Sequence, residues 1–260
     1  MKYTLQIQER EKIFCFNELT GGPGTECDTC PDYTYEDVVN KYWPAAVGGV
    51  LKLTGKTEAA YVGHSNGGRV ALDSMKNYTN VRNVQSYLSD GTPFTLNSIN
   101  PSNPITNYIG VGVPGNFSQV GFFGQRVAEK GNDAITSLQN ENIIHPSFSD
   151  IKAHILNLPF IENQNKISIN LFERYYQLIS SASDMQPGTG VALNKVTMIY
   201  GTLDFDPSIS SDTIVPVSDV VAIFNLISSP DKQLESTTTT HPGQTKSKSI
   251  KTIIKTRLNE

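Results

Sequence analysis

The stretch that decides the fold runs from residue 59 to residue 75 and reads Ala59-Ala60-Tyr61-Val62-Gly63-His64-Ser65-Asn66-Gly67-Gly68-Arg69-Val70-Ala71-Leu72-Asp73-Ser74-Met75. Its apolar start predicts a buried strand, and the apolar spacing after residue 68 predicts a helix. Between them lies G-x-S-x-G, which also occurs by chance as an ordinary tight turn. A strand before and a helix after favour a catalytic turn that lifts the serine oxygen above a sheet edge. We predict Ser65 as a nucleophile and the backbone N–H of Asn66 as one oxyanion-hole donor.

Further strands and helices alternate on both sides of this turn. Strands are predicted at 12–16, 59–62, 107–113 and 195–200, and helices at 35–51, 69–75, 220–227 and 249–258. Thr34, with Asp37 three residues later, predicts a capped start for the first helix, and Pro44 predicts a kink within it. A polar connection is expected after residue 227. Alternation of strands and helices predicts an α/β fold with a mostly parallel sheet flanked by helices.

Residues 117–190 differ from the rest of the chain. Helical periodicity recurs at 127–138, 151–158 and 171–179, separated by polar loops. We interpret this stretch as a helical cap inserted into a core formed by 1–116 and 191–260. Its apolar residues are expected to pack the cap onto the core or to line an acyl-chain tunnel, and they are Phe117, Val120, Phe122, Phe123, Leu156, Leu158, Phe160 and Ile161.

A serine hydroxyl is a weak nucleophile at neutral pH and needs a general base held by an acid. Three histidines follow Ser65 in the chain. His145 and His154 lie in the helical insertion, where a surface or packing role is expected. His241 lies in a loop before the last helix, and such a loop can fold over the sheet edge. We therefore predict His241 as the base.

Three aspartates after the strand at 195–200 compete for the role of the acid. Asp212 precedes the apolar segment Thr213-Ile214-Val215-Pro216, which would hold its loop in place, and is preferred. Asp204 lies nearer the strand end and is the alternative. Asp206, directly before a proline, is typical of a turn. Asp219 is expected to cap the following helix.

Composition limits the possible partners. The chain has 260 residues and a formal net charge of −4, with an isoelectric point near 5.6. This mild acidity argues against nucleic acid as a partner, because no basic field is available to neutralise phosphates. No apolar run approaches the ~20 residues of a membrane helix, and the N-terminus lacks the apolar stretch of a signal peptide. A cytoplasmic location is expected, unless an export signal lies outside this chain.

Neither a metal nor an organic cofactor is expected. Cys27 and Cys30 form one C-x-x-C without a second pair of ligands, and Cys15 stands alone, so ordinary thiols or a local disulfide are the simpler interpretations. Gly110–Gly115 fits G-x-G-x-x-G after a strand. A dinucleotide site also needs a helix that starts at once, and residues 117–123 are typical of a loop. We interpret these glycines as a strand end beside the nucleophile.

Taken together, these residues resemble the α/β-hydrolase superfamily, and within it the lipase and esterase branch. The resemblance rests on the Gly63–Gly68 turn, on Asp212–Pro216, on His241 with the Gly-Gln-Thr-Lys that follows, and on the helix expected at 33–50. It spans roughly residues 11–116 and 191–260. It implies an α/β-hydrolase fold with a helical cap, a Ser65–His241–Asp212 triad and no cofactor.

One departure concerns the second oxyanion donor. The superfamily usually supplies it from a loop after an earlier strand, often marked His-Gly, and no His-Gly precedes Ser65 here. Either the chain lacks the usual N-terminal strands, or Phe16-Asn17-Glu18-Leu19 takes over the role on a shortened sheet. The second donor is therefore unassigned.

The resulting hypothesis is a carboxylic-ester hydrolase that works through an acyl-enzyme and acts on a small-molecule ester or lipid-like substrate. The same triad serves a thioesterase, an acyltransferase or a peptidase. A different class is also open, a catalytically silent hydrolase-like scaffold that binds a partner through its cap.

Overall fold

The computed structural model describes most of the predicted core. The described residues are 7–8, 11–12, 14–17, 33–88, 90–115, 122–143, 146, 169–170, 173, 176–177, 187–202, 215–241 and 243–260. For 7–8, 11–12, 14–17 and 122–128 only the backbone is described. The predicted helix at 151–158 lies outside this part of the chain.

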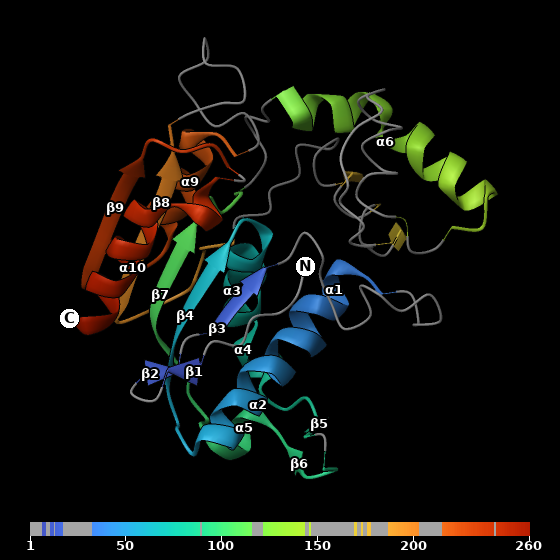
Figure 1. The fold of residues 1–260 in the computed structure, drawn as a ribbon. Coiled ribbons are helices and arrows are strands. Elements are labelled where there is room, and N and C mark those ends of the chain that lie inside the picture. The colour runs from blue at the N-terminus through green and yellow to red at the C-terminus, as the bar shows by residue number, and fades with distance from the viewer. Residues whose placement is uncertain are drawn as a thin grey trace.

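Five parallel strands form the central sheet, in the order β3-β4-β7-β8-β9 (Figure 1). Their bounds are Phe14–Asn17, Ala59–His64, Ile105–Val111, Lys195–Gly201 and Asp231–Thr237. The three central strands confirm those predicted around 59–62, 107–113 and 195–200. A small antiparallel pair, β1 (Ile7–Gln8) with β2 (Glu11–Lys12), precedes the sheet. A second antiparallel pair, β5 (Ser86–Tyr87) with β6 (Pro93–Phe94), lies between β4 and β7 in the chain. The parallel sheet confirms the predicted α/β class.

Strand β9 corrects the prediction of a plain polar connection after residue 227. Its sequence, Asp-Lys-Gln-Leu-Glu-Ser-Thr, carries one aliphatic residue and therefore lacks an apolar signal. It is an edge strand of the sheet, and most of its side chains are partly or fully exposed. An edge strand needs only main-chain hydrogen bonds on one side, so sequence periodicity does not reveal it. From the carboxyl end of β9 the chain continues to His241.

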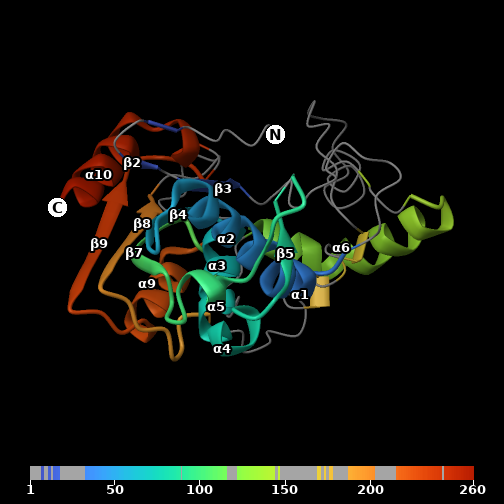
Figure 2. The same ribbon diagram turned by 90° about the horizontal axis from the view of Figure 1, so that it is seen from below.

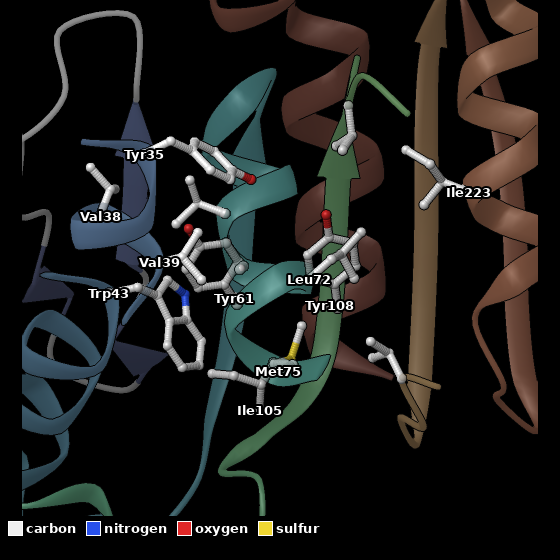
Figure 3. Packing of buried hydrophobic residues seen from close by; sticks show 14 of the residues in the cluster. Tyr35, Val38, Val39, Trp43, Tyr61, Leu72, Met75, Ile105, Tyr108 and Ile223 are labelled. Carbon is white, nitrogen blue, oxygen red and sulfur yellow. The ribbon is translucent and has the colours of Figure 1, made fainter. Parts of the chain in front are cut away.

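Helices cover both faces of the sheet (Figure 2). On one face lie α1 (Tyr35–Asp37), η1 (Val38–Tyr42), α2 (Trp43–Thr54), α3 (Asn66–Lys76) and α9 (Val217–Leu226). Figure 3 shows side chains of α1, η1, α2 and α3 around Tyr61 and Tyr108 of the sheet, and Ile223 of α9 farther along the same layer. On the other face α10 (Lys248–Asn259) packs on Val62, Ile109 and Ile199. Period-two alternation along β4, β7 and β8 thus supplies apolar residues to both layers.

The short helices complete the core. They are α4 (Tyr78–Val81), α5 (Leu96–Ile99) and the 3-10 turn η2 (Gln244–Lys246).

Helix α10 is anchored by Arg257, whose buried guanidinium donates to Thr197 Oγ1 at 2.7 Å and to Asp231 Oδ1 at 2.8 Å. This anchor fixes the helix that follows the loop of His241.

The helix predicted at 35–51 forms, with a change of hydrogen-bond register before Pro44. Thr34 and Asp37 make the predicted capping box. The Trp43 N–H donates to Val38 O, five residues back, so the segment before Pro44 is π-helical. The carbonyl of Val39 accepts from Ser74 Oγ of α3 at 2.7 Å. The missing proline N–H thus produces a register change, and α3 satisfies a carbonyl beside it.

The expected cap is described only in part. Helix α6 spans Phe122–Asn140, so it begins within the segment 117–123 that was expected to be a loop. The described residues 169, 170, 173, 176 and 177 are helical, in agreement with the periodicity at 171–179. Figure 1 draws α6 beyond the ends toward which the strands point. No helix among the residues described is long and apolar enough to cross a membrane.

Candidate active site

Ser65 occupies the turn between β4 and α3, as predicted. Its backbone has φ 54° and ψ −131°, a positive-φ conformation outside the allowed regions that L-residues rarely adopt. A Cβ on Gly63 would lie 2.5 Å from Gly68 Cα, and a Cβ on Gly68 would lie 2.4 Å from Val113 Cγ2. The strained turn therefore depends on close contact between the glycines at 63 and 68, the second of which stands just beyond the G-x-S-x-G motif.

Two buried tyrosines of the sheet hold the first turn of α3. Tyr61 Oη donates to Gly67 O at 2.9 Å, and Tyr108 Oη donates to Gly68 O at 2.9 Å. Their rings stack in parallel, with centroids 6.1 Å apart. Burial raises the pKa of Tyr108 well above its ordinary value, so its hydroxyl stays a donor. The helix start behind Ser65 is therefore held to the sheet by hydrogen bonds as well as by packing.

His241 meets Ser65 across 176 residues of sequence. Its Nε2 lies 3.0 Å from Ser65 Oγ, within hydrogen-bond distance, and both side chains are buried. Strand β9 ends at Thr237, at the same sheet edge where β4 ends at His64, and the residues after it carry the imidazole to the serine. The structure thus brings together two of the three predicted catalytic side chains.

His64, the residue before the serine, contacts His241 from the side of β4. Its Nε2 lies 3.2 Å from the backbone oxygen of His241, and the two rings have centroids 4.8 Å apart at 37°. Because a carbonyl oxygen only accepts, Nε2 of His64 carries the proton. Burial, and to a smaller degree the charge that His241 can carry, lower the pKa of His64 from 6.5 to about 3. His64 is therefore neutral at physiological pH.

This lowered pKa predicts an acid-sensitive contribution to stability. Below pH 6.5 the unfolded chain protonates His64, whereas the folded chain does not do so until about pH 3. The unfolded state thus binds more protons in this window, and the free energy of unfolding should fall by about 1.4 kcal/mol per pH unit on acidification. Urea unfolding at pH 7, 6, 5 and 4 measures this slope.

The matched control for the acid effect is His64→Gln, which does not titrate. All other groups titrate in both proteins, so the difference between the two slopes isolates His64. The wild-type slope should exceed that of the variant between pH 6 and pH 4. Parallel curves would contradict the lowered pKa.

Gly112 and Gln244 complete the surroundings of the His241 ring. Gly112 has φ +56°, and a Cβ there would lie 2.3 Å from Gln244 Oε1 and 2.9 Å from His241 Nδ1. Gln244 is buried, and its Nε2 would lie 2.7 Å from a Cβ on Gly201. Glycines at the ends of β7 and β8 therefore leave room for the buried amide and the imidazole.

Gly112→Ala should reduce turnover by displacing this ring. The added methyl group would force Gln244 or His241 to move, and a shift of about 1 Å in a catalytic group can cost about 100-fold in rate. We expect kcat to fall by about that factor, measured with a chromogenic ester. Gly91→Ala is the control, because Gly91 also has positive φ (+82°) but has open space around its Cβ position. Equal losses in both variants would show that backbone strain, and not the clash, is responsible.

The predicted acids lie outside the described residues. Asp204, Asp206 and Asp212 all belong to the connection between Gly201 and Val215, which leaves the carboxyl end of β8. The prediction that Asp219 caps the following helix is wrong, because the N-cap of α9 is Pro216. The Asp219 carboxylate instead accepts from the Gly115 N–H at 2.8 Å and ties the turn after β7 to α9.

The predicted oxyanion donors lie near the start of α3 and the end of β3. The backbone N–H groups of Gly68 and Arg69 donate to the carbonyl oxygen of Ser65. Asn66, whose N–H is the predicted oxyanion donor, is the first residue of α3. Strand β3 pairs in parallel with β4, with Asn17 opposite His64. Strand β3 therefore ends at the same sheet edge as Ser65, and the second donor stays unassigned. Glu18 and Leu19 themselves lie outside the described residues.

The other histidines and the cysteines considered in the sequence cannot be placed at this site. His145, His154, Cys27 and Cys30 lie outside the described residues, and the side chain of Cys15 is not described either. In the part of the chain that is described, no group of three or more His, Cys, Asp or Glu side chains could hold a metal ion.

The residues that surround His241 were not predicted from the sequence. His64 was counted only as part of the motif, and Gly112 only as part of a glycine pattern typical of nucleotide sites. Gln244 was noted only as part of the segment after His241. A glycine at the end of a central strand is a signal of close approach by another group, but the sequence does not say which group approaches.

Two solved structures are similar to this chain in fold. A point mutant of an epoxide hydrolase from Bacillus megaterium aligns with a TM-score of 0.51 at 12% identity, covering 92% of this chain and 79% of that chain. A Bacillus megaterium epoxide hydrolase in complex with an inhibitor aligns with a TM-score of 0.50 at 12% identity, covering 92% of this chain and 79% of that chain. No protein-family model matches the sequence, and no curated protein matches it. At this identity the likeness shows the fold alone.

Proposed function

We propose that this chain, which has the α/β-hydrolase fold, is a serine hydrolase that cleaves carboxylic esters through an acyl-enzyme. The observation that carries the proposal is the 3.0 Å approach of His241 Nε2 to Ser65 Oγ at the strained turn after β4. A nucleophile within hydrogen-bond reach of a base, on a backbone that exposes it at a sheet edge, is the arrangement that acyl transfer requires.

The reaction uses the two residues in turn. His241 removes the proton from Ser65 Oγ, and the oxygen attacks the acyl carbon while the Asn66 N–H stabilises the negative carbonyl oxygen. The protonated imidazole then gives its proton to the leaving alcohol. Water, deprotonated by the same imidazole, releases the acid and restores Ser65. Asp212 is proposed to orient His241 from the connection after β8, with no metal or cofactor taking part.

The chemistry of serine favours an acyl substrate over an epoxide, the substrate in the name of the structural neighbours. Attack of Ser65 Oγ on an epoxide carbon would form an ether, which neither water nor a histidine base cleaves at a useful rate. Attack on an ester forms a new ester, which hydrolysis removes. Only the acyl reaction therefore returns the enzyme to its starting state.

The substrate is proposed to be a small-molecule ester with an apolar acyl part. Residues 117–190, which carry the apolar side chains given above, are proposed to form a cap over the acyl site, with the core at 1–116 and 191–260. Helix α6 contributes buried Ala134, Ile135 and Leu138 to the main core cluster, which supports a cap packed on the core.

A fluorophosphonate probe and a substrate panel test this function. The folded protein should be labelled covalently, whereas heat-denatured protein should not, because labelling needs the assembled base and nucleophile. Chromogenic esters of increasing chain length should be hydrolysed faster than matched thioesters, anilides and epoxides. Preference for a thioester or an amide would reassign the substrate class, and a folded protein that is not labelled would favour a catalytically silent binding scaffold.

The choice of acid predicts a difference between two aspartates. Asp212→Asn should lower kcat by about 100- to 10,000-fold, because an amide cannot hold the imidazole in the tautomer that the base requires. Asp204→Asn is the matched control, since it lies in the same connection and should cost less than 10-fold. Steady-state hydrolysis of one chromogenic ester measures both. The reverse order of losses would assign Asp204 as the acid.

A further inference from the structure

We propose that His64 is a positioning residue that holds the catalytic base His241 at a fixed distance from Ser65; this inference rests on the proposed function. The contact that carries it is the hydrogen bond from His64 Nε2 to the backbone oxygen of His241 at 3.2 Å. The tilted stacking of the two rings, with centroids 4.8 Å apart, is a second contact between the same residues.

The two ends of this contact differ in how firmly the fold holds them. His64 is the last residue of β4, a strand that pairs with β3 on one side and β7 on the other. His241 lies between the edge strand β9 and the short turn η2. A hydrogen bond from the central strand to the carbonyl of His241 therefore transfers the rigidity of the sheet to the loop that carries the base.

The position of His64 in the sequence makes this contact effective. His64 and Ser65 are consecutive, so the nucleophile and the anchor of the base share one strand end. Any small movement of β4 carries both, and the 3.0 Å distance from Ser65 Oγ to His241 Nε2 is preserved. A base anchored elsewhere would change its distance to the serine whenever the two anchoring elements moved relative to one another.

The protonation state of His64 suits this role. The carbonyl of His241 requires a proton on Nε2, and the lowered pKa keeps the His64 ring neutral above about pH 3. A neutral ring can donate this hydrogen bond without placing a second positive charge beside His241 when that residue holds the serine proton. The titratable or polar side chains that influence His64 are those of His241 and Gln244.

A matched pair of variants tests the inference. In His64→Gln the side-chain amide nitrogen can reach the place of Nε2 and donate, whereas His64→Met has similar length and no donor. We expect His64→Met to lower kcat by about 10- to 100-fold with KM changed less than 3-fold, because the base is displaced and not the substrate. His64→Gln should recover to within about 5-fold of wild type. Equal losses in the two variants would overturn the proposal.

A readout other than turnover separates this inference from the proposed function. Ring resonances of His241 in a histidine-labelled protein should shift in His64→Met and return toward wild type in His64→Gln, while circular dichroism confirms that both variants are folded. Unchanged His241 resonances in His64→Met would overturn the positioning role, whatever the activity. A wild-type protein with no hydrolase activity but with these resonance changes would overturn the proposed function and leave the contact established.

Discussion

Ser65→Ala should lower kcat for ester hydrolysis by about 10,000- to 1,000,000-fold. The substitution removes the only atom that forms the covalent acyl bond, and catalysis would then depend on the oxyanion donors and substrate binding alone. Labelling by a fluorophosphonate should disappear completely. Because alanine is smaller than serine, the strained turn gains no new clash, and the free energy of unfolding should change little.

The control for this variant is Ser102→Ala, an exposed serine in the loop that precedes β7. That loop lies at the amino end of the strand, whereas Ser65 follows the carboxyl end of β4. Ser102→Ala should keep wild-type turnover and full labelling. Residual labelling of Ser65→Ala at the wild-type rate would place the nucleophile elsewhere and remove the basis of the proposed function.

His241→Ala should cost nearly as much as loss of the serine, about 10,000-fold or more in kcat. Without the imidazole, 3.0 Å from Ser65 Oγ, no described side chain stands ready to take the serine proton. KM should change little, because His241 contacts the reacting atoms and not the bulk of the substrate. Steady-state kinetics with a chromogenic ester and the rate of fluorophosphonate labelling measure both quantities.

Two comparisons sharpen the result for His241. His145→Ala should retain turnover within about 2-fold, since a packing or surface role is expected for that residue. The double variant Ser65→Ala with His241→Ala should be no slower than Ser65→Ala alone, because the two side chains act as one unit. Equal losses in His145→Ala and His241→Ala, or additive losses in the double variant, would contradict the assignment of the base.

The core of the fold could be predicted because its signals are local. Apolar runs marked β4, β7 and β8, and the capping box at Thr34 and Asp37 marked the start of a helix. Strand β9 could not be predicted, because an edge strand is held by main-chain pairing that its polar side chains do not reveal. The register change before Pro44 was anticipated only as a kink.

The sequence alone predicted the turn at Ser65, and with it the candidate nucleophile, because the geometry of this turn arises within a few residues. Glycines at 63 and 68 and a strand followed by a helix are written directly in the chain order. It also indicated His241 as the base, but only by its order after Ser65 and its place in a loop before the last helix.

Only the tertiary structure decided that His241 reaches Ser65, and which groups hold it there. Those contacts join β4, β7, β8 and the loop after β9, and the closest pair is separated by 176 residues. No local pattern encodes such a distance, because it depends on how the strands pair and on which glycines leave space at their ends. Pairing and packing are properties of the whole sheet, so the surroundings of the base became visible only once the chain was folded.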